Sequence, residues 1–275
     1  MLLWNFQIGC TKVSTGCINC YAEASYKRYG RDFTLVHKTG QFYTIKNVKT
    51  YPPGSDIWVC NSSDFFHNNT DGWRSEIWKM IKSRPDLRFL IVTKRIERYM
   101  RSLPSDWNDG YDHVWICCTA EDQENADKRL PIFNDLPAKH KMIMVEPIFS
   151  KVDLSKYLST GKYVQVVSGG ECCMSRNCRL TRWSDVKYLY DQCKKYNVTF
   201  VFERTGTRWV GEEQTDQNKY TFIRGQGKQV EEAERLNLNY WSGNPDCFHL
   251  PIKFSGEYAY KRKCKTGTNF RNLFV

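Results

Sequence analysis

The chain has 275 residues, a formal net charge of +11 at pH 7 and an isoelectric point near 9.0. This length fits one barrel-sized domain, and no run approaches the roughly 18 apolar residues of a membrane helix, so no membrane-spanning helix is expected. The excess of Lys and Arg, with 15% aromatic residues, favours an anionic partner such as a nucleic acid or nucleotide. The most concentrated basic and aromatic stretch is residues 258–265, although such a run is more often just a solvated face.

The chain begins with a short apolar run at residues 2–8, which predicts a strand, and a helix-like stretch follows at 21–29. Between them lie three cysteines with the spacing C-x6-C-x2-C, namely Cys10, Cys17 and Cys20. Three thiolates can hold an iron–sulfur cluster while one of its metal positions stays open for chemistry. The cysteines are therefore the first candidate metal ligands.

Two other interpretations of these cysteines stay open. Cys17 and Cys20 have the spacing of a zinc knuckle, but no second C-x2-C or H-x3-H pair follows at the usual distance to complete a zinc site. A disulfide is the second alternative. Twelve cysteines with no signal peptide suit a reducing, cytoplasmic setting, where thiols stay free or bind metal.

Further along the chain, apolar segments of strand length alternate with helix-like stretches. Continuous apolar runs are typical of strands buried on both faces of a parallel sheet. Helices are expected at 74–82 and at 183–193, where Ser184 is a candidate N-cap. The pattern predicts an α/β fold whose parallel sheet forms a full or partial βα barrel over about 205 residues, with strands at 57–60, 89–92, 114–118, 142–145, 163–167 and 199–202.

Polar residues follow each of these expected strands. In a parallel barrel the active site is built at the carboxyl ends of the strands, so these side chains are expected to line a cavity beside the three cysteines. A single polar residue at a strand end is usually only a solvated group, but six successive ends form a pattern. The candidates are Asn61, Ser63, Lys94, Glu121, Glu146, Gly169, Gly170 and Glu171.

The ordered series of motifs resembles the radical S-adenosylmethionine (SAM) enzymes, more narrowly the three-cysteine-motif family of phages and bacteria. Its members read W-N-x-x-x-G-C-T-K-V-S-x-G-C-x-x-C-Y-A-E near the N-terminus, and this chain matches from Trp4 to Glu23. The six-residue gap between the first two cysteines departs from the C-x3-C-x2-C of most radical SAM enzymes and matches the narrower family. The similarity continues over about the first 205 residues through 63–67, 93–95, 145–147, 169–171 and 191–193.

The resemblance implies a partial barrel of the radical SAM type and a [4Fe–4S] cluster held by Cys10, Cys17 and Cys20. SAM would chelate the fourth iron, and one electron from an external donor would cleave it to methionine and a 5′-deoxyadenosyl radical. Lys94 or Arg95 is expected to pair with the SAM carboxylate. Glu121, Glu146 or Glu171 is expected to accept from the SAM ammonium or ribose hydroxyls, and Gly169 and Gly170 are expected to let the protein backbone approach the ligand. Asn61 and Ser63 are the remaining candidates for SAM binding. Alternatively, each carboxylate pairs with a neighbouring base as scaffolding.

Residues 1–205 are expected to form the barrel, and residues 206–275 a C-terminal extension that covers the barrel or its substrate. Cys60, Cys117 and Cys118 fall in apolar strands and are expected in the core. Buried free thiols are preferred over a second metal site for the remaining group, which consists of Cys172, Cys173, Cys178 and Cys193.

The charge favours a nucleic acid or nucleotide substrate, and modified thymidine in phage DNA is a possibility by analogy with phage radical SAM enzymes. Two alternatives remain. One is a radical SAM enzyme acting on a peptide or small metabolite, and the other is a non-enzymatic, metal-bound module that binds nucleic acid.

Overall fold

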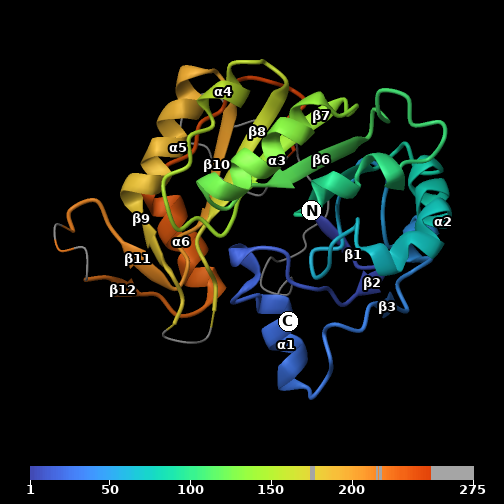
Figure 1. Ribbon diagram of the computed structural model, residues 1–275, viewed down its shortest axis with the longest axis horizontal. Helices are drawn as coiled ribbons and strands as arrows, with labels where there is room; N and C mark the ends of the chain where they lie inside the picture. The colour runs from blue at the N-terminus through green and yellow to red at the C-terminus, as the bar shows by residue number, and fades with distance from the viewer. Residues whose placement is uncertain (174–176, 215, 217–218, 249–275) are drawn as a thin grey trace.

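The computed structural model describes residues 1–173, 177–214, 216 and 219–248, and its centre is a seven-stranded parallel sheet. The sheet curls into a half-barrel that is open between its edge strands β1 and β10 (Figure 1). The α/β class is therefore confirmed, and the barrel is partial rather than full. In spatial order the strands are β1 (Leu2–Trp4), β4 (Asp56–Val59), β5 (Arg88–Thr93), β6 (Val114–Thr119), β7 (His140–Val145), β8 (Tyr163–Gly169) and β10 (Thr199–Arg204).

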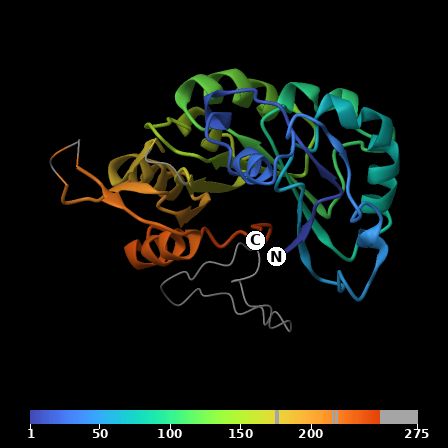
Figure 2. The same ribbon diagram turned by 90° about the horizontal axis from the view of Figure 1, so that it is seen from below.

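Helices connect successive strands and cover the outer side of the curled sheet (Figure 2). Each has one apolar face: Ile77, Trp78 and Ile81 of the first covering helix, for example, are fully or almost fully buried. They join the main core with the outward-facing side chains of the strands, which is the packing expected for a parallel sheet. The covering helices are α2 (Asp71–Lys82), α3 (Gln123–Asp135), α4 (Ser155–Leu158) and α5 (Trp183–Lys195).

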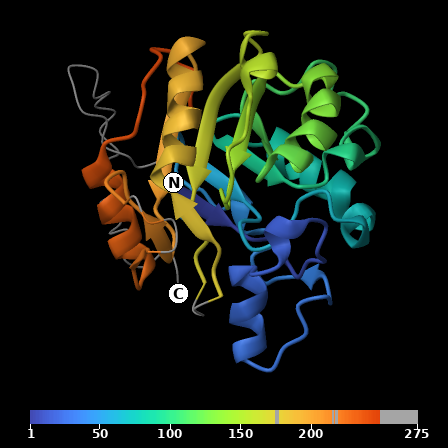
Figure 3. The same ribbon diagram turned by 60° about the vertical axis from the view of Figure 1, so that its left-hand side comes forward.

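Smaller elements surround the half-barrel. The helix α1 (Tyr21–Arg28) extends away from the body of the molecule (Figure 3), and α6 (Gln226–Leu236) packs beside β10. Two short sheets consist of β2 (Gln7–Ile8) with β3 (His37–Lys38), and of β12 (Thr221–Phe222), β11 (Arg208–Val210) and β9 (Leu180–Arg182). The described residues also form five 3-10 turns: η1 (Thr15–Cys17), η2 (Thr44–Lys46), η3 (Asn68–Thr70), η4 (Ile96–Arg98) and η5 (Met100–Ser102).

Two local expectations are wrong. The apolar run at residues 2–8 forms two strands in different sheets, because β1 pairs with β4 while β2 turns away to pair with β3. Ser184 is not the N-cap of α5, because the helix begins at Trp183 and Arg182 occupies the N-cap position. The Ser184 hydroxyl donates to the Asp185 carboxylate instead. Cys60, Cys117 and Cys118 are buried, as expected.

The inner side of the half-barrel is closed at its amino end by an apolar plug around Trp115 and Phe248. The Trp115 indole donates to the Asp246 carbonyl at 2.6 Å, stacks on His140, and meets the Phe248 ring edge-on. The Arg88 guanidinium lies over both Trp115 and Phe248. In the part of the chain that is described, no helix is long and apolar enough to span a membrane.

Candidate functional site

The three candidate metal ligands lie on one loop, residues 9–20, which we call the cysteine loop. Its start is fixed to the end of β4, because the Ser63 hydroxyl donates to the Gly9 carbonyl at 2.5 Å. Gly9 has a positive φ of 94°, and a side chain there would collide with the Leu35 backbone, so glycine is needed at this position. The Cys10 amide then donates to the Phe33 carbonyl at 2.8 Å.

Arg95, just beyond β5, fixes the next part of the loop. Its guanidinium donates to the Cys10 Sγ at 3.4 Å and to the Thr11 carbonyl at 2.7 Å, and it forms an ion pair with Asp64 at 3.2 Å. Burial raises the pKa of the Cys10 thiol to about 11, although the neighbouring Arg95 charge opposes the rise. Arg95 is thus committed to the cysteine loop, which leaves Lys94 as the freer base at this strand end.

All three cysteines are free thiols and are half-buried. The Cys17 thiol interacts electrostatically with the thiols of both Cys10 and Cys20. Burial also raises the pKa of Cys20. Within the described ranges, however, no group of three or more His, Cys, Asp or Glu side chains has the arrangement of a metal-ion site.

Glu121, after β6, holds the middle of the cysteine loop. It is fully buried, accepts from the Ser14 hydroxyl, and forms an ion pair with Arg129 at 2.7 Å. Burial acts to raise the pKa of this carboxyl, but Lys94, Arg129 and Ser14 outweigh that effect and the pKa is lowered. A Cβ at Gly16 would lie 2.5 Å from the carboxylate, so the loop packs directly on Glu121.

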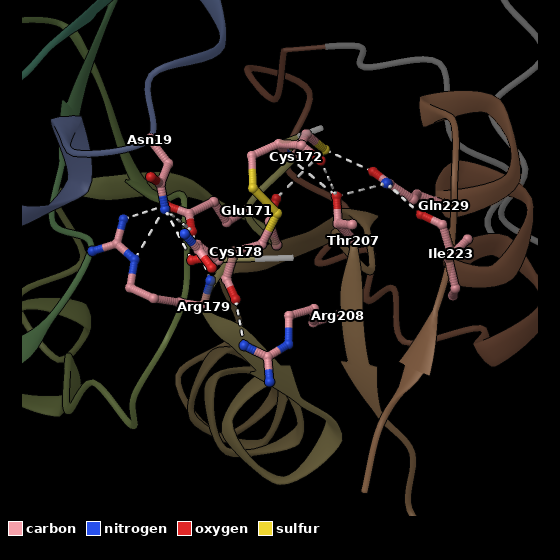
Figure 4. Close-up of a disulfide and its surroundings, with 12 residues drawn as sticks. Asn19, Glu171, Cys172, Cys178, Arg179, Thr207, Arg208, Ile223 and Gln229 are labelled. Carbon is pink, nitrogen blue, oxygen red and sulfur yellow. Dashed lines mark hydrogen bonds and ion pairs between the residues drawn. A yellow bond between two sulfur atoms is a disulfide. The ribbon is translucent and has the colours of Figure 1, made fainter. Parts of the chain in front are cut away.

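Glu171, after β8, holds the end of the same loop (Figure 4). Its carboxylate accepts from the Asn19 amide at 2.9 Å and from the Arg179 backbone at 2.8 Å, and it forms an ion pair with the Arg179 guanidinium. Arg179 also donates to the Thr15 carbonyl at 2.9 Å and lies over the Phe149 ring. Burial acts to raise the pKa of Glu171, but these donors lower it.

Glu146, after β7, has a different environment. Arg204 Nε lies 3.3 Å from its Oε1, while its Oε2 is buried and has no hydrogen-bond partner among the described residues. Burial raises the pKa of Glu146 to about 7; Arg204 and Lys94 oppose the rise, and the neighbouring Glu203 adds to it. This carboxyl is therefore the candidate site residue that can exchange a proton near neutral pH.

The remaining predicted residues lie at the same end of the sheet. The Asn61 carbonyl accepts from the Tyr21 hydroxyl, and Lys94 Nζ donates to the Glu146 carbonyl at 3.2 Å while lying 3.9 Å from Glu121. A Cβ on Gly169 would lie 2.9 Å from the Glu146 carboxyl carbon, and one on Gly170 would collide with Thr205 and Thr181. In this structure both glycines thus allow close packing of protein groups.

Two of the further cysteines differ from the expectation of free thiols. Cys173 and Cys178 form a disulfide across a Cα–Cα distance of 5.8 Å, within the usual span of such bonds. Cys172 and Cys193 are free. The Thr207 hydroxyl accepts from the Cys173 backbone amide at 3.2 Å and donates to the Cys173 carbonyl at 2.9 Å (Figure 4). Arg208 donates to the Cys178 carbonyl at 2.9 Å, so both disulfide cysteines are bonded to the beginning of β11.

Several residues at the site were not singled out from the sequence. Arg179, Arg129 and Asn19 hold the carboxylates or the cysteine loop, but nothing in the local sequence distinguishes them from surface residues. His67, already part of a recognised motif, is buried, and its Nε2 lies 3.1 Å from the Thr11 hydroxyl. The basic stretch 258–265 lies outside the described residues.

The site is thus a half-buried loop with three thiols, bonded to the carboxyl ends of four strands of a parallel half-barrel. Comparison with known proteins identifies the family to which this chain belongs: residues 2–243 match the family described as "Protein of unknown function (DUF5131)". No curated protein matches the chain. No solved structure matches it either.

Proposed function

We propose that this protein is a radical SAM enzyme that modifies a nucleic acid or nucleotide. The observation that carries the proposal is the grouping of three free thiols on one anchored loop at the carboxyl ends of the half-barrel strands. Active sites of parallel barrels are built at this end. The ordered motifs that resemble the three-cysteine-motif family add independent support.

The donor set of the cysteine loop fits an iron–sulfur cluster. Cys10, Cys17 and Cys20 supply three sulfur ligands, which is one fewer than a four-iron cluster needs from protein alone. The Arg95 guanidinium beside Cys10 favours the thiolate form that binds metal, and binding would release protons from thiols whose pKa burial has raised. When bound, such a cluster supplies the electron for reductive cleavage of SAM.

The residues around the loop have separate tasks in this proposal. Glu121 and Glu171 keep the loop in place through Ser14 and Asn19, and are already paired with Arg129 and Arg179. Lys94 and Glu146 are less fully paired and remain the better candidates to bind the carboxylate and ammonium of SAM. The buried walls would keep water from a reactive intermediate.

The test starts from anaerobic protein reconstituted with iron and sulfide. We expect close to one [4Fe–4S] cluster per chain, and expect Cys10→Ala, Cys17→Ala and Cys20→Ala each to remove it, since no protein ligand is spare. Cys172→Ser is the matched control, because Cys172 is also a half-buried free thiol but lies on another loop. Full iron retention in all three variants would contradict the cluster assignment.

A second measurement tests the enzyme itself. Reduced, cluster-loaded protein is expected to convert SAM to 5′-deoxyadenosine, which chromatography with mass detection quantifies. Loaded protein that yields none, with or without oligonucleotides, would leave the metal-bound binding module as the better assignment.

A further inference from the structure

The helix α1 is set apart from the other helices by its exposure. Among the described residues, seven of the nine large apolar side chains that are exposed lie between Val13 and Val48, and Ile18, Tyr21 and Tyr29 flank or begin this helix. Tyr29 is 70% exposed, and Ile18 is 57% exposed. Exposed apolar side chains gathered in one short part of a chain indicate an interaction surface.

The inner and outer faces of α1 differ sharply. Ala22 is buried and Tyr26 packs against Phe33, so these two residues attach the helix. The opposite face follows the i, i+3, i+4, i+7 spacing of one helical stripe and is exposed throughout. From the cysteine loop outward, this α1 stripe consists of Tyr21, Ala24, Ser25 and Arg28, with Tyr29 beside its end.

The charge around the α1 stripe is positive. Residues 11–50 contain seven Lys or Arg against two Asp or Glu, and Glu23 already pairs with Lys12 and Lys27 at 3.0 and 2.8 Å. Residues 104–135 show the reverse, with eight Asp or Glu against two Lys or Arg. The basic excess of the chain is therefore unevenly distributed along the sequence, and the segment that contains the cysteine loop and α1 is one of its basic parts.

We propose that the α1 stripe is the docking surface for a single-stranded nucleic acid, which it directs toward the cysteine loop. Lys and Arg at the far end of the helix bind phosphates, and the exposed tyrosines stack on unpaired bases. Between the basic end of the helix and Tyr21, the small side chains of Ala24 and Ser25 let the nucleic acid lie close to the helix. Tyr21 directly follows Cys20, so a strand on this stripe ends at the thiols. The substrate class rests on the proposed function, whereas the location of the surface does not.

The chain offers a matched control for the basic residues. The helix α1 ends in Lys27-Arg28 followed by Tyr29, and α5 ends in Lys194-Lys195 followed by Tyr196. All four basic residues are exposed in the last turn of their helix, so neutralising either pair removes the same charge from the same helix position. The two pairs lie at different places relative to the sheet. The cysteine loop and α1 follow each other at the carboxyl end of the sheet, whereas α5 ends just before β10 begins, at the amino end of the sheet.

The experiment measures the affinity of the full chain for a labelled 20-nucleotide single strand, as DNA and as RNA, by fluorescence anisotropy across a salt series. We expect the Lys27→Gln/Arg28→Gln variant to bind about tenfold more weakly at low salt, with a salt slope shallower by about 1 to 2. Tyr29→Ala is expected to weaken binding at least about fivefold at every salt concentration without changing the slope, because it removes stacking rather than charge.

The Lys194→Gln/Lys195→Gln variant is expected to bind like the wild type, and a duplex of the same sequence more weakly than the single strand. Equal losses in the α1 and α5 variants, equal affinity for the duplex, or no binding at low salt would each overturn the docking proposal. Iron content and SAM cleavage by the same variants separate the two proposals. Normal cleavage without strand binding refutes only the docking surface, and strand binding without cleavage refutes only the enzyme.

Discussion

The two ends of the half-barrel are built by the same seven strands and have opposite character. At the amino end, Trp115 and Phe248 form an apolar plug with two polar contacts, from the Trp115 indole to the Asp246 carbonyl and from the Phe248 amide to the Gln165 side chain. At the carboxyl end, buried carboxylates pair with Arg or Lys and carry the cysteine loop. Apolar packing and buried charge are thus separated along the strands, so the carboxyl end can hold buried ion pairs while apolar contacts stabilise the amino end.

The largest effect is expected at the plug. Trp115→Ala should lower the free energy of unfolding by about 4 kcal/mol, because it removes a buried aromatic ring together with its contacts to His140 and Phe248. Urea denaturation followed by circular dichroism measures this. Ile18→Ala, at an exposed position of the cysteine loop, should change stability by less than about 0.5 kcal/mol. Similar losses in both variants would remove the distinction between the two ends.

The next effect concerns the carboxyl end. Glu121→Gln should cost about 3 kcal/mol, because it leaves the buried Arg129 guanidinium without its ionic partner. The double variant Glu121→Gln/Arg129→Met should recover part of that loss, since no unpaired charge then remains buried. A double variant as unstable as the sum of the two single variants would show that the pair does not act as a unit.

A smaller loss is expected at the disulfide loop. Replacing Cys173 and Cys178 together by Ser should lower stability by about 2 kcal/mol, the chain-entropy value for so short a loop. Denaturation with and without a reductant provides the comparison, because reduced wild type and the double variant should then coincide. A wild-type protein indifferent to the reductant would mean that these thiols are not joined in solution.

The smallest effect is a pH dependence that distinguishes Glu146 from the other carboxylates. Its pKa is raised to about 7, so between roughly pH 4.5 and 7 the folded protein binds more protons than the unfolded chain, and stability falls as pH rises. Glu146→Gln should remove this fall, which is at most about 1.4 kcal/mol per pH unit, while keeping an amide oxygen near Arg204. Stability measured at pH 5, 6, 7 and 8 tests it.

Two other carboxylates act in the opposite direction in a lower window. The pKa values of Glu121 and Glu171 are lowered, so their contribution to folding stability is present above about pH 4.3 and is lost as the pH falls through their pKa values in the folded protein.

The charged and titratable groups that interact with Glu146 are Lys94, Glu203, Arg204, Tyr21, Cys117 and Cys172. Of these, Tyr21, Cys117 and Cys172 have raised pKa values that lie above this range. A Glu146→Gln variant with an unchanged pH profile would contradict the assignment.

The sequence was most informative where residues are buried on both faces of the sheet. The run 114–118 was expected as a strand, and β6 spans Val114–Thr119, because a continuous apolar stretch of that length can hardly fold otherwise in a parallel sheet. The candidate residues after the strands also fall at one end of the sheet, since parallel strands share a direction. The hydrogen bonds between the cysteine loop and the strand ends were not predictable, because their partners are far apart in the sequence. Asn19 and Glu171, for example, are 152 positions apart in the chain.

Residues 2–8 show where a local sequence pattern is not sufficient to predict the strands. Local pattern cannot tell one strand from two strands that pair with different partners, because the partner positions at 37–38 and 57–59 are set by tertiary contacts. The Cys173–Cys178 bond has the same origin, since two thiols five positions apart carry no local signal of whether they meet. The commitment of Arg95 to Cys10 likewise depends on how β5 places its end against the cysteine loop.

The attachment of the cysteine loop to β4, β5, β6 and β8 means that its shape depends on how strongly the sheet is curved. A flatter sheet would pull Ser63 and Glu171 apart and stretch the loop between them. The rate at which a small alkylating reagent modifies Cys10, Cys17 and Cys20 should therefore depend on the curvature of the entire half-barrel. Alkylation of these thiols would then measure how far the sheet fluctuates between more curved and flatter shapes.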